Sequence, residues 1–97
     1  MVDKMIIKAV GGYTENSWTN PRTGETKQIK SYGLVLQNGN NSFVAEASDE
    51  MAVKMKSMDI KPDAIALVSL SFVATSNEKE GSVRYFQRVR IEHIILL

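Results

Sequence analysis

The sequence contains no cysteine. This absence excludes disulfide bonds and thiolate metal sites, and it is compatible with the reducing conditions of a cytoplasm. The sequence also lacks an excess of charge of either sign. It has 12 Lys and Arg residues against 11 Asp and Glu residues, which leave a formal net charge of +1. Any binding of a polyanion must therefore depend on where the cations lie, and not on their excess.

Long hydrophobic runs are absent as well. No stretch approaches the roughly 20 apolar residues of a membrane span, and the apolar run at residues 5–7 is too short for a signal peptide. We therefore expect a protein without membrane association. The chain is 43% hydrophobic and 24% charged over 97 residues, which is typical of one globular domain covering residues 1–97.

Catalytic and metal-binding constellations are missing from the sequence. The single histidine, His93, lies among apolar residues near the end of a predicted strand and reads as a structural residue. No pair of carboxylates suggests general acid–base chemistry, and no glycine-rich loop precedes a helix. We expect a protein that is not an enzyme and that uses no metal, no cofactor and no small-molecule substrate.

Hydrophobic periodicity predicts five strands and one short helix. Ser48 is a suitable N-cap for a helix of about ten residues, and Asn38-Gly39-Asn40 is typical of a hairpin turn. Gly11 and Gly12 predict a bulge in the first strand. The strands are expected at residues 4–15, 26–37, 42–47, 64–74 and 83–95, with polar loops at residues 16–25 and 76–81.

The order of these elements is three strands, a helix and two strands. It predicts an all-β fold, a five-stranded Greek-key barrel of the OB type with its helix between strands three and four. An SH3-like barrel is the alternative, but it does not readily explain the inserted helix. In the OB arrangement the loop between strands one and two and the loop between strands four and five form the binding site.

The last predicted strand carries the most informative pattern. Side chains alternate between the two faces of a strand, so one face is apolar and the other combines arginines with an aromatic ring. Guanidinium groups pair with phosphates, and a ring can stack on a base. A solvated face with Phe86 covered by a neighbour is the alternative. The apolar face is expected to hold Val83, Tyr85, Val89, Ile91 and Ile95, and the opposite face Arg84, Phe86, Arg88 and Arg90.

A second basic and aromatic segment covers residues 21–34. Arg22, Lys27 and Lys30 supply cations, and Tyr32 lies where the strand passes from a wet surface into the core at Leu34. Tyr32 is thus either a binding residue or a core residue at the rim of the barrel. Trp18 precedes the segment in a polar loop, where it either binds a ligand or packs onto the barrel.

These patterns favour binding of a single nucleic-acid strand with little sequence preference. Cations neutralise phosphates and rings stack on any base, whereas a duplex reader more often presents a basic helix. The predicted helix carries Asp49 and Glu50 beside its lysines. RNA offers the same contacts as DNA, and a protein-interaction barrel in a phage or conjugative assembly is the alternative from another functional class.

The residues at Arg22-Thr23-Gly24, Lys27-Gln28, Lys30, Tyr32 and Leu34 closely resemble the loop and second strand of the gene V proteins of filamentous phages. The resemblance covers about fourteen residues without a gap, and Arg88-Val89-Arg90-Ile91 looks like the final basic strand of that family. Members of the family are small dimeric OB-fold proteins that coat single-stranded DNA.

The resemblance implies a homodimer that covers and protects single-stranded DNA during replication of a phage or mobile element, in the cytoplasm of a bacterial host. It also implies an aromatic residue near the tip of the loop between strands four and five. That loop has no ring here, and Phe86 or Trp18 would take its place. By the resemblance, the residues that face the DNA are Arg22, Lys27, Tyr32, Leu34, Arg88 and Arg90.

Overall fold

A computed structural model of the chain describes residues 2–97, without the side chains of residues 75, 77 and 79. The predicted element order is confirmed. The elements are β1 (Val2–Thr19), β2 (Thr26–Asn38), β3 (Asn41–Ser48), α1 (Asp49–Lys56), β4 (Ile65–Lys79) and β5 (Ser82–Leu96).

The five strands form a closed barrel in the order β1-β2-β3-β5-β4. Neighbouring strands are antiparallel, except that β3 and β5 run parallel where Glu46 pairs with Arg90. This closed barrel with one short helix between β3 and β4 is consistent with an OB-like fold. The predicted fold class is therefore confirmed.

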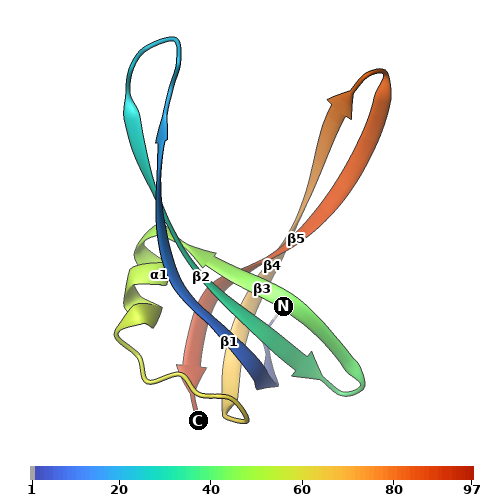
Figure 1. Cartoon of the computed structure of the whole chain (residues 1–97). Helices are drawn as coiled ribbons and strands as arrows, with labels where there is room; N and C mark the ends of the chain where they lie inside the picture. The colour runs from blue at the N-terminus through green and yellow to red at the C-terminus, as the bar shows by residue number, and fades with distance from the viewer. Residues whose placement is uncertain (1) are drawn as a thin grey trace.

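The core comes from alternate residues of every strand, as the period of two requires. In β2, for example, Leu34 and Leu36 are almost fully buried while Val35 between them is not. The helix α1 adds Ala52 and Met55, and it packs against β1 and β2 (Figure 1). The other core residues from the strands are Met5, Ile7, Tyr32, Ala45, Ala47, Ala66, Val68, Leu70, Ile91 and Ile94.

Two long hairpins extend from the same end of the barrel and diverge (Figure 1). We call residues 13–32 the first arm, from β1 and β2, and residues 72–89 the second arm, from β4 and β5. The arms give the chain a radius of gyration of 15.4 Å, against about 12.5 Å for a compact domain of this length.

The first arm leaves the barrel at the predicted bulge. The pairing of β1 with β2 shifts between Ile7 and Ala9 and again between Val10 and Gly12, and such bulges bend a strand. At Gly11 the two backbones approach closely, because a Cβ there would lie 3.1 Å from the carbonyl oxygen of Gly33. A larger residue at position 11 would therefore force the two strands apart.

The arms make the strands longer than the sequence predicts. Residues 16–19 and 76–79, predicted as loop, belong to β1 and β4. The second arm ends in a two-residue turn, in which Glu80 and Gly81 both have positive φ, as a type I′ turn requires. The helix is shorter than predicted, with eight residues, and it is not long and apolar enough to cross a membrane, nor is any other described segment a helix that could.

A bulge in β5 corrects one predicted face. Ser69 pairs with His93 but Leu70 pairs with Ile91, so Glu92 is an extra residue that reverses the alternation beyond it. Ile94 is consequently buried and Ile95 is 58% exposed. The prediction that Ile95 shares the core face with Ile91 is wrong for this reason.

Candidate nucleic-acid interface

The first arm presents one of its two faces on the outer surface of the barrel. Residues directly opposite each other in an antiparallel pair share a face, and Trp18 lies opposite Lys27 while Asn16 lies opposite Ile29. Trp18 is 51% exposed and Ile29 is 48% exposed. This face of the arm therefore combines an indole ring, an aliphatic surface and a cation.

The second arm carries the arginines and Phe86 on one face, as the sequence predicts. Arg88 lies opposite Val73 and Arg90 opposite Ser71, whereas the core residues Leu70 and Ile91 belong to the other face. The alternation places Arg84 and Phe86 on the same side as Arg88 and Arg90, and Phe86 is half exposed.

The strand β3 joins these two faces into one surface. Ser31 of β2 lies opposite Ser48 of β3, and Glu46 of β3 pairs with Arg90 of β5. The surface thus runs from the first arm across β3 to the second arm. We call it the outer face, and it holds Trp18, Lys27, Ile29, Ser31, Ser48, Glu46, Arg84, Phe86, Arg88 and Arg90.

The cations of the outer face have no carboxylate partners in the described part of the chain. The one ion pair among the described residues joins Lys61 and Asp59 at 3.3 Å, far from the arms. Lys27, Arg88 and Arg90 are therefore available to an external anion. All three side chains are exposed to solvent, on the surface where a ligand would lie.

Arg22 lies at the tip of the first arm, in the turn between β1 and β2. The Arg22 backbone N–H donates to Oδ1 of Asn20 at 2.9 Å, and the Gly24 N–H donates to the Asn20 carbonyl at 2.8 Å. Asn20 thereby organises the turn in the manner of an Asx motif. The exposed Arg22 side chain extends the line of cations to the end of the arm.

Three predicted site residues do not lie on the outer face. Tyr32 is 7% exposed and Leu34 is 2% exposed, and both belong to the core. Burial raises the pKa of the Tyr32 phenol, because the charged form is poorly solvated there. Lys30 lies opposite Glu15 on the inner face of the first arm, the side toward α1. We therefore do not include Tyr32, Leu34 or Lys30 in the outer face.

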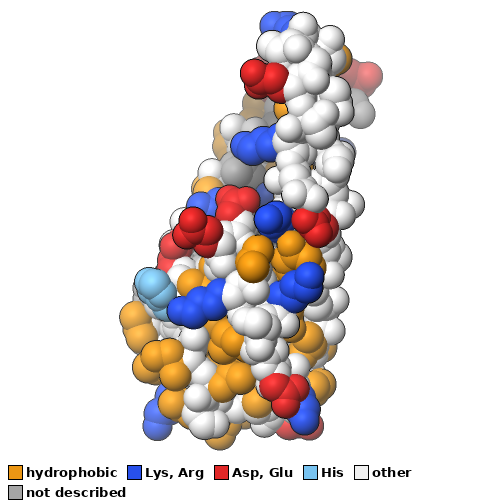
Figure 2. All heavy atoms as spheres, turned by 90° about the vertical axis from the view of Figure 1, so that its left-hand side faces the viewer, with side chains coloured by type: hydrophobic (Ala, Val, Ile, Leu, Met, Phe, Trp, Pro, Cys, Tyr) orange, Lys and Arg blue, Asp and Glu red, His pale blue; other side chains and the backbone are white. Residues whose placement is uncertain are grey.

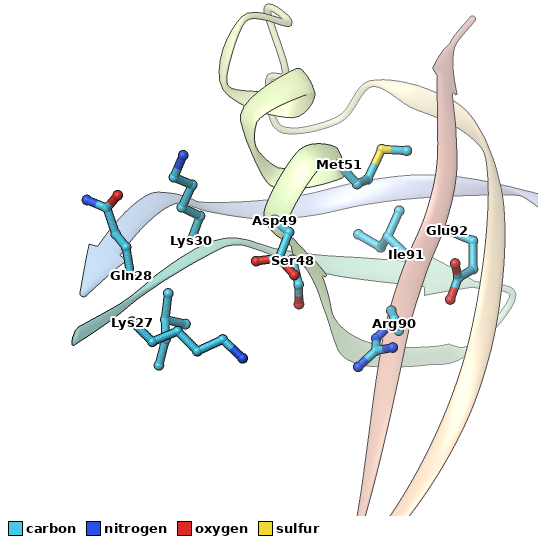
Figure 3. Close-up of a pocket in the computed structure, with 10 residues that line it drawn as sticks. Lys27, Gln28, Lys30, Ser48, Asp49, Met51, Arg90, Ile91 and Glu92 are labelled. Atoms are coloured by element: carbon cyan, nitrogen blue, oxygen red, sulfur yellow. The ribbon is translucent and has the colours of Figure 1, made fainter. Parts of the chain in front are cut away.

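A pocket of about 370 Å³ lies at the base of the two arms, between β2, the start of α1 and β5. Figure 3 shows Lys27 on one side of β2, with Gln28 and Lys30 on the other side. The Lys27 and Arg90 side chains point toward each other across the gap between β2 and β5 (Figure 3). A smaller hollow of about 100 Å³ continues along β5 beside Arg88 and Arg90.

The pocket includes residues that the sequence did not single out as binding residues. Ile29 falls within the second predicted strand, and Asp49 is an acidic residue at the start of the predicted helix, where it suits the helix dipole. Ser48 occupies the predicted N-cap position but its side chain makes no capping hydrogen bond. Only the pairing of the strands brings these residues beside the cations, although alternation with Lys27 already places Ile29 on the same face as this cation.

His93 is exposed at the C-terminal end of β5. Among the residues that the structure describes, no group of three or more His, Asp or Glu side chains is placed to hold a metal ion. No protein-family model matches the chain, and no curated protein sequence matches it significantly. The function must therefore be argued from the outer face itself.

Proposed function

We propose that the protein binds single-stranded DNA along its outer face and coats it with little sequence preference. One observation carries this proposal, namely that Lys27 and Trp18 on the first arm and Arg88 and Arg90 on the second arm share one continuous, exposed surface. Cations and rings on a common surface are the two features that hold single strands without reading their sequence.

The shape of the protein favours a single strand over a duplex. The helix α1 begins with Asp49 and Glu50 and ends with Lys54 and Lys56, so it lacks the basic character of a helix that enters the major groove. Figure 2, which faces the side that carries α1, shows blue and red side chains interspersed. The unpaired cations lie instead on strands and on an arm tip, where a flexible strand can follow them.

The second arm supports a homodimer. Its inner face, continuous with the core, exposes Phe72 to 50%, Val83 to 49% and Tyr85 to 79%. The chain exposes 7085 Å² in total, whereas a compact protein of this mass exposes about 5,500 Å². This excess of about 1,500 Å² per chain is larger than the roughly 800 Å² that each partner buries in a standard interface. We propose that this face packs on a second copy.

The setting of the activity rests on the resemblance between residues 22–34 and the gene V proteins. It supports a stoichiometric role in covering and protecting DNA during replication of a phage or mobile element inside a bacterial host. The binding surface itself does not depend on that setting, because its cations and rings act on any single strand.

A protein-interaction module is the second candidate, and one observation favours it. The outer side of β1, β4 and β5 exposes Ile6, Ile65 and Ile95, and Leu97 follows β5, with exposed fractions between 41% and 65%. Ile6 lies opposite Ile65, whose carbonyl accepts a hydrogen bond from the Leu97 N–H. Figure 2 shows hydrophobic side chains gathered beside the histidine at the lower left. Neighbouring apolar residues of this kind mark an interface with another protein.

Titration of the protein with poly-dT, followed by Trp18 fluorescence, tests the proposal. We expect saturable quenching, with an affinity that falls about 50-fold between about 50 mM and about 200 mM salt if four phosphates are contacted. A folded protein whose emission and anisotropy do not change at low salt would favour the interaction module. Competition by matched RNA and DNA oligonucleotides decides between the two nucleic acids.

A further inference from the structure

The pocket at the base of the arms brings carboxylates beside the cations of the outer face. It is lined by Ser48, Asp49 and Glu92 together with Lys27 and Arg90, and Glu92 already accepts a hydrogen bond from the Ser71 hydroxyl. Its volume of about 370 Å³ is within the range of small-molecule binding sites. A single group of a bound nucleic-acid strand can therefore enter the pocket, although the strand as a whole cannot.

Two cations flank this pocket from different strands. Lys27 extends from β2 and Arg90 from β5, and the two side chains point toward each other (Figure 3). A strand that follows the outer face from one arm to the other must cross between them. Because neither cation has a carboxylate partner among the described residues, both can contact the phosphates on either side of a nucleotide at this point.

The wall of the pocket suits the flat face of a base. Ile29 is 48% exposed, and Met51 from α1 is partly buried against the core. An aliphatic side chain and a polarizable thioether offer an apolar surface on which an aromatic ring can lie. The pocket thus provides a place for a base between two positions for phosphates.

Asp49 provides a hydrogen-bond acceptor in the same place. Its carboxylate extends from the start of α1 toward the gap between β2 and β5 (Figure 3). No described side chain forms a hydrogen bond or an ion pair with it. An ionised carboxylate only accepts hydrogen bonds, so it favours a base with donors on the edge that it presents.

We infer that this pocket seats one base of the bound strand and that Asp49 selects guanine there. Guanine presents two neighbouring donors on its Watson–Crick edge, which match the two oxygens of a carboxylate, whereas thymine presents one donor between two acceptors. The inference rests on the proposed binding of single-stranded DNA. It adds a modest preference at one nucleotide to binding that is otherwise independent of sequence.

Competition between two oligonucleotides of equal length tests the inference. One is oligo-dT, and the other is oligo-dT with a single central dG, so that their charges are identical. We expect the dG-containing strand to bind about fivefold more tightly to the unaltered protein, at the low end of the discrimination by paired hydrogen bonds. The Asp49→Asn variant should reduce this ratio to about one, because a neutral amide no longer presents two acceptors.

Asn is the suitable replacement because Asp49 has a φ of 53°, and Asn tolerates this left-handed conformation. Glu50→Gln is the matched control, since it removes one negative charge from the next residue of α1, which does not line this pocket. It should raise the affinity for both strands equally and keep their ratio.

Equal affinity of the unaltered protein for the two strands would overturn the selection of guanine while leaving the proposed function intact. Failure of both strands to bind would instead contradict the proposed function. A ratio that persists in Asp49→Asn would show that the preference arises elsewhere, and would also overturn the inference.

Discussion

Trp18 and Lys27 lie directly opposite each other across the β1–β2 pair, so the two side chains share the outer face of the first arm. The indole is 51% exposed, and an exposed ring of this size on a strand is unusual unless it contacts something. Under the proposed function, this pairing places a ring on which a base can stack beside a cation that can contact a phosphate, the two parts needed to hold one nucleotide.

The Trp18→Thr variant should bind oligo-dT about tenfold more weakly, since stacking on an aromatic side chain contributes about 1–3 kcal/mol per base. Thr keeps the β propensity of the strand, and the half-exposed site should leave stability nearly unchanged. Anisotropy of a labelled oligonucleotide measures the affinity without tryptophan. Val2→Thr is the control, an exposed apolar residue of β1 far from the arm, and a similar loss there would refute the role of Trp18.

The Arg88→Gln variant should weaken binding to every sequence alike and reduce the dependence on salt. Removal of one phosphate contact lowers the slope of log K against log salt concentration by about 0.7 for a single strand. Lys4→Gln removes a charge from exposed β1 at the other end of the barrel and should leave the slope unchanged. Equal slopes for Arg88→Gln and the unaltered protein would contradict a phosphate contact.

The order of the elements could be predicted from the sequence because each strand of the barrel must alternate buried and exposed side chains. Core residues such as Leu34 and Leu36, and the glycine bulge at Gly11, follow from periodicity and backbone chemistry. The arms were less predictable, since residues 16–19 and 76–79 have little to bury and so carry no hydrophobic period. Their pairing depends on the turn residues and on the strands below them.

The candidate site was predictable where one strand carries it and less so where several meet. The arginines of β5 share a face by simple alternation, as predicted. Tyr32 and Leu34 were also placed correctly on one face of β2, but the point at which that face enters the core depends on α1 and β1. The position of Asp49 beside Lys27 and Arg90 follows only from closure of the barrel.

The Leu34→Ala variant distinguishes a core role from a direct contact with DNA. Leu34 is 2% exposed, so its truncation should lower the free energy of unfolding by about 2–5 kcal/mol, measured by urea denaturation. The fraction that remains folded should bind oligo-dT with unchanged affinity. Val44→Ala, at a site that is 62% exposed on β3, should change stability by less than about 0.5 kcal/mol. Weaker binding of oligo-dT by the fully folded Leu34→Ala variant would show that Leu34 contacts the DNA directly.

Two adjacent residues of the second arm should have separate effects, because they lie on opposite faces. Tyr85→Ser alters the inner face and should shift the protein toward a monomer, as measured by light scattering after size exclusion. Phe86→Ser alters the outer face and should leave the dimer intact while weakening binding of oligo-dT about fivefold. A dimer that survives Tyr85→Ser combined with Phe72→Ser would contradict the proposed subunit interface.

The buried phenol of Tyr32 predicts a loss of stability at alkaline pH. Burial raises the pKa of Tyr32 in the folded state, so between the ordinary tyrosine pKa of about 10 and the raised value the folded state binds more protons than the unfolded state. The free energy of unfolding must therefore fall as pH rises through this window, and the stability is fully retained at pH values below the window.

Urea denaturation at a series of pH values measures this fall in the free energy of unfolding. Tyr32→Phe should lessen this fall, because the variant has no phenol proton to lose. Tyr13→Phe, which removes a phenol that is only partly buried, should keep it. An alkaline limb that is identical in Tyr32→Phe and the unaltered protein would mean that another group causes the loss.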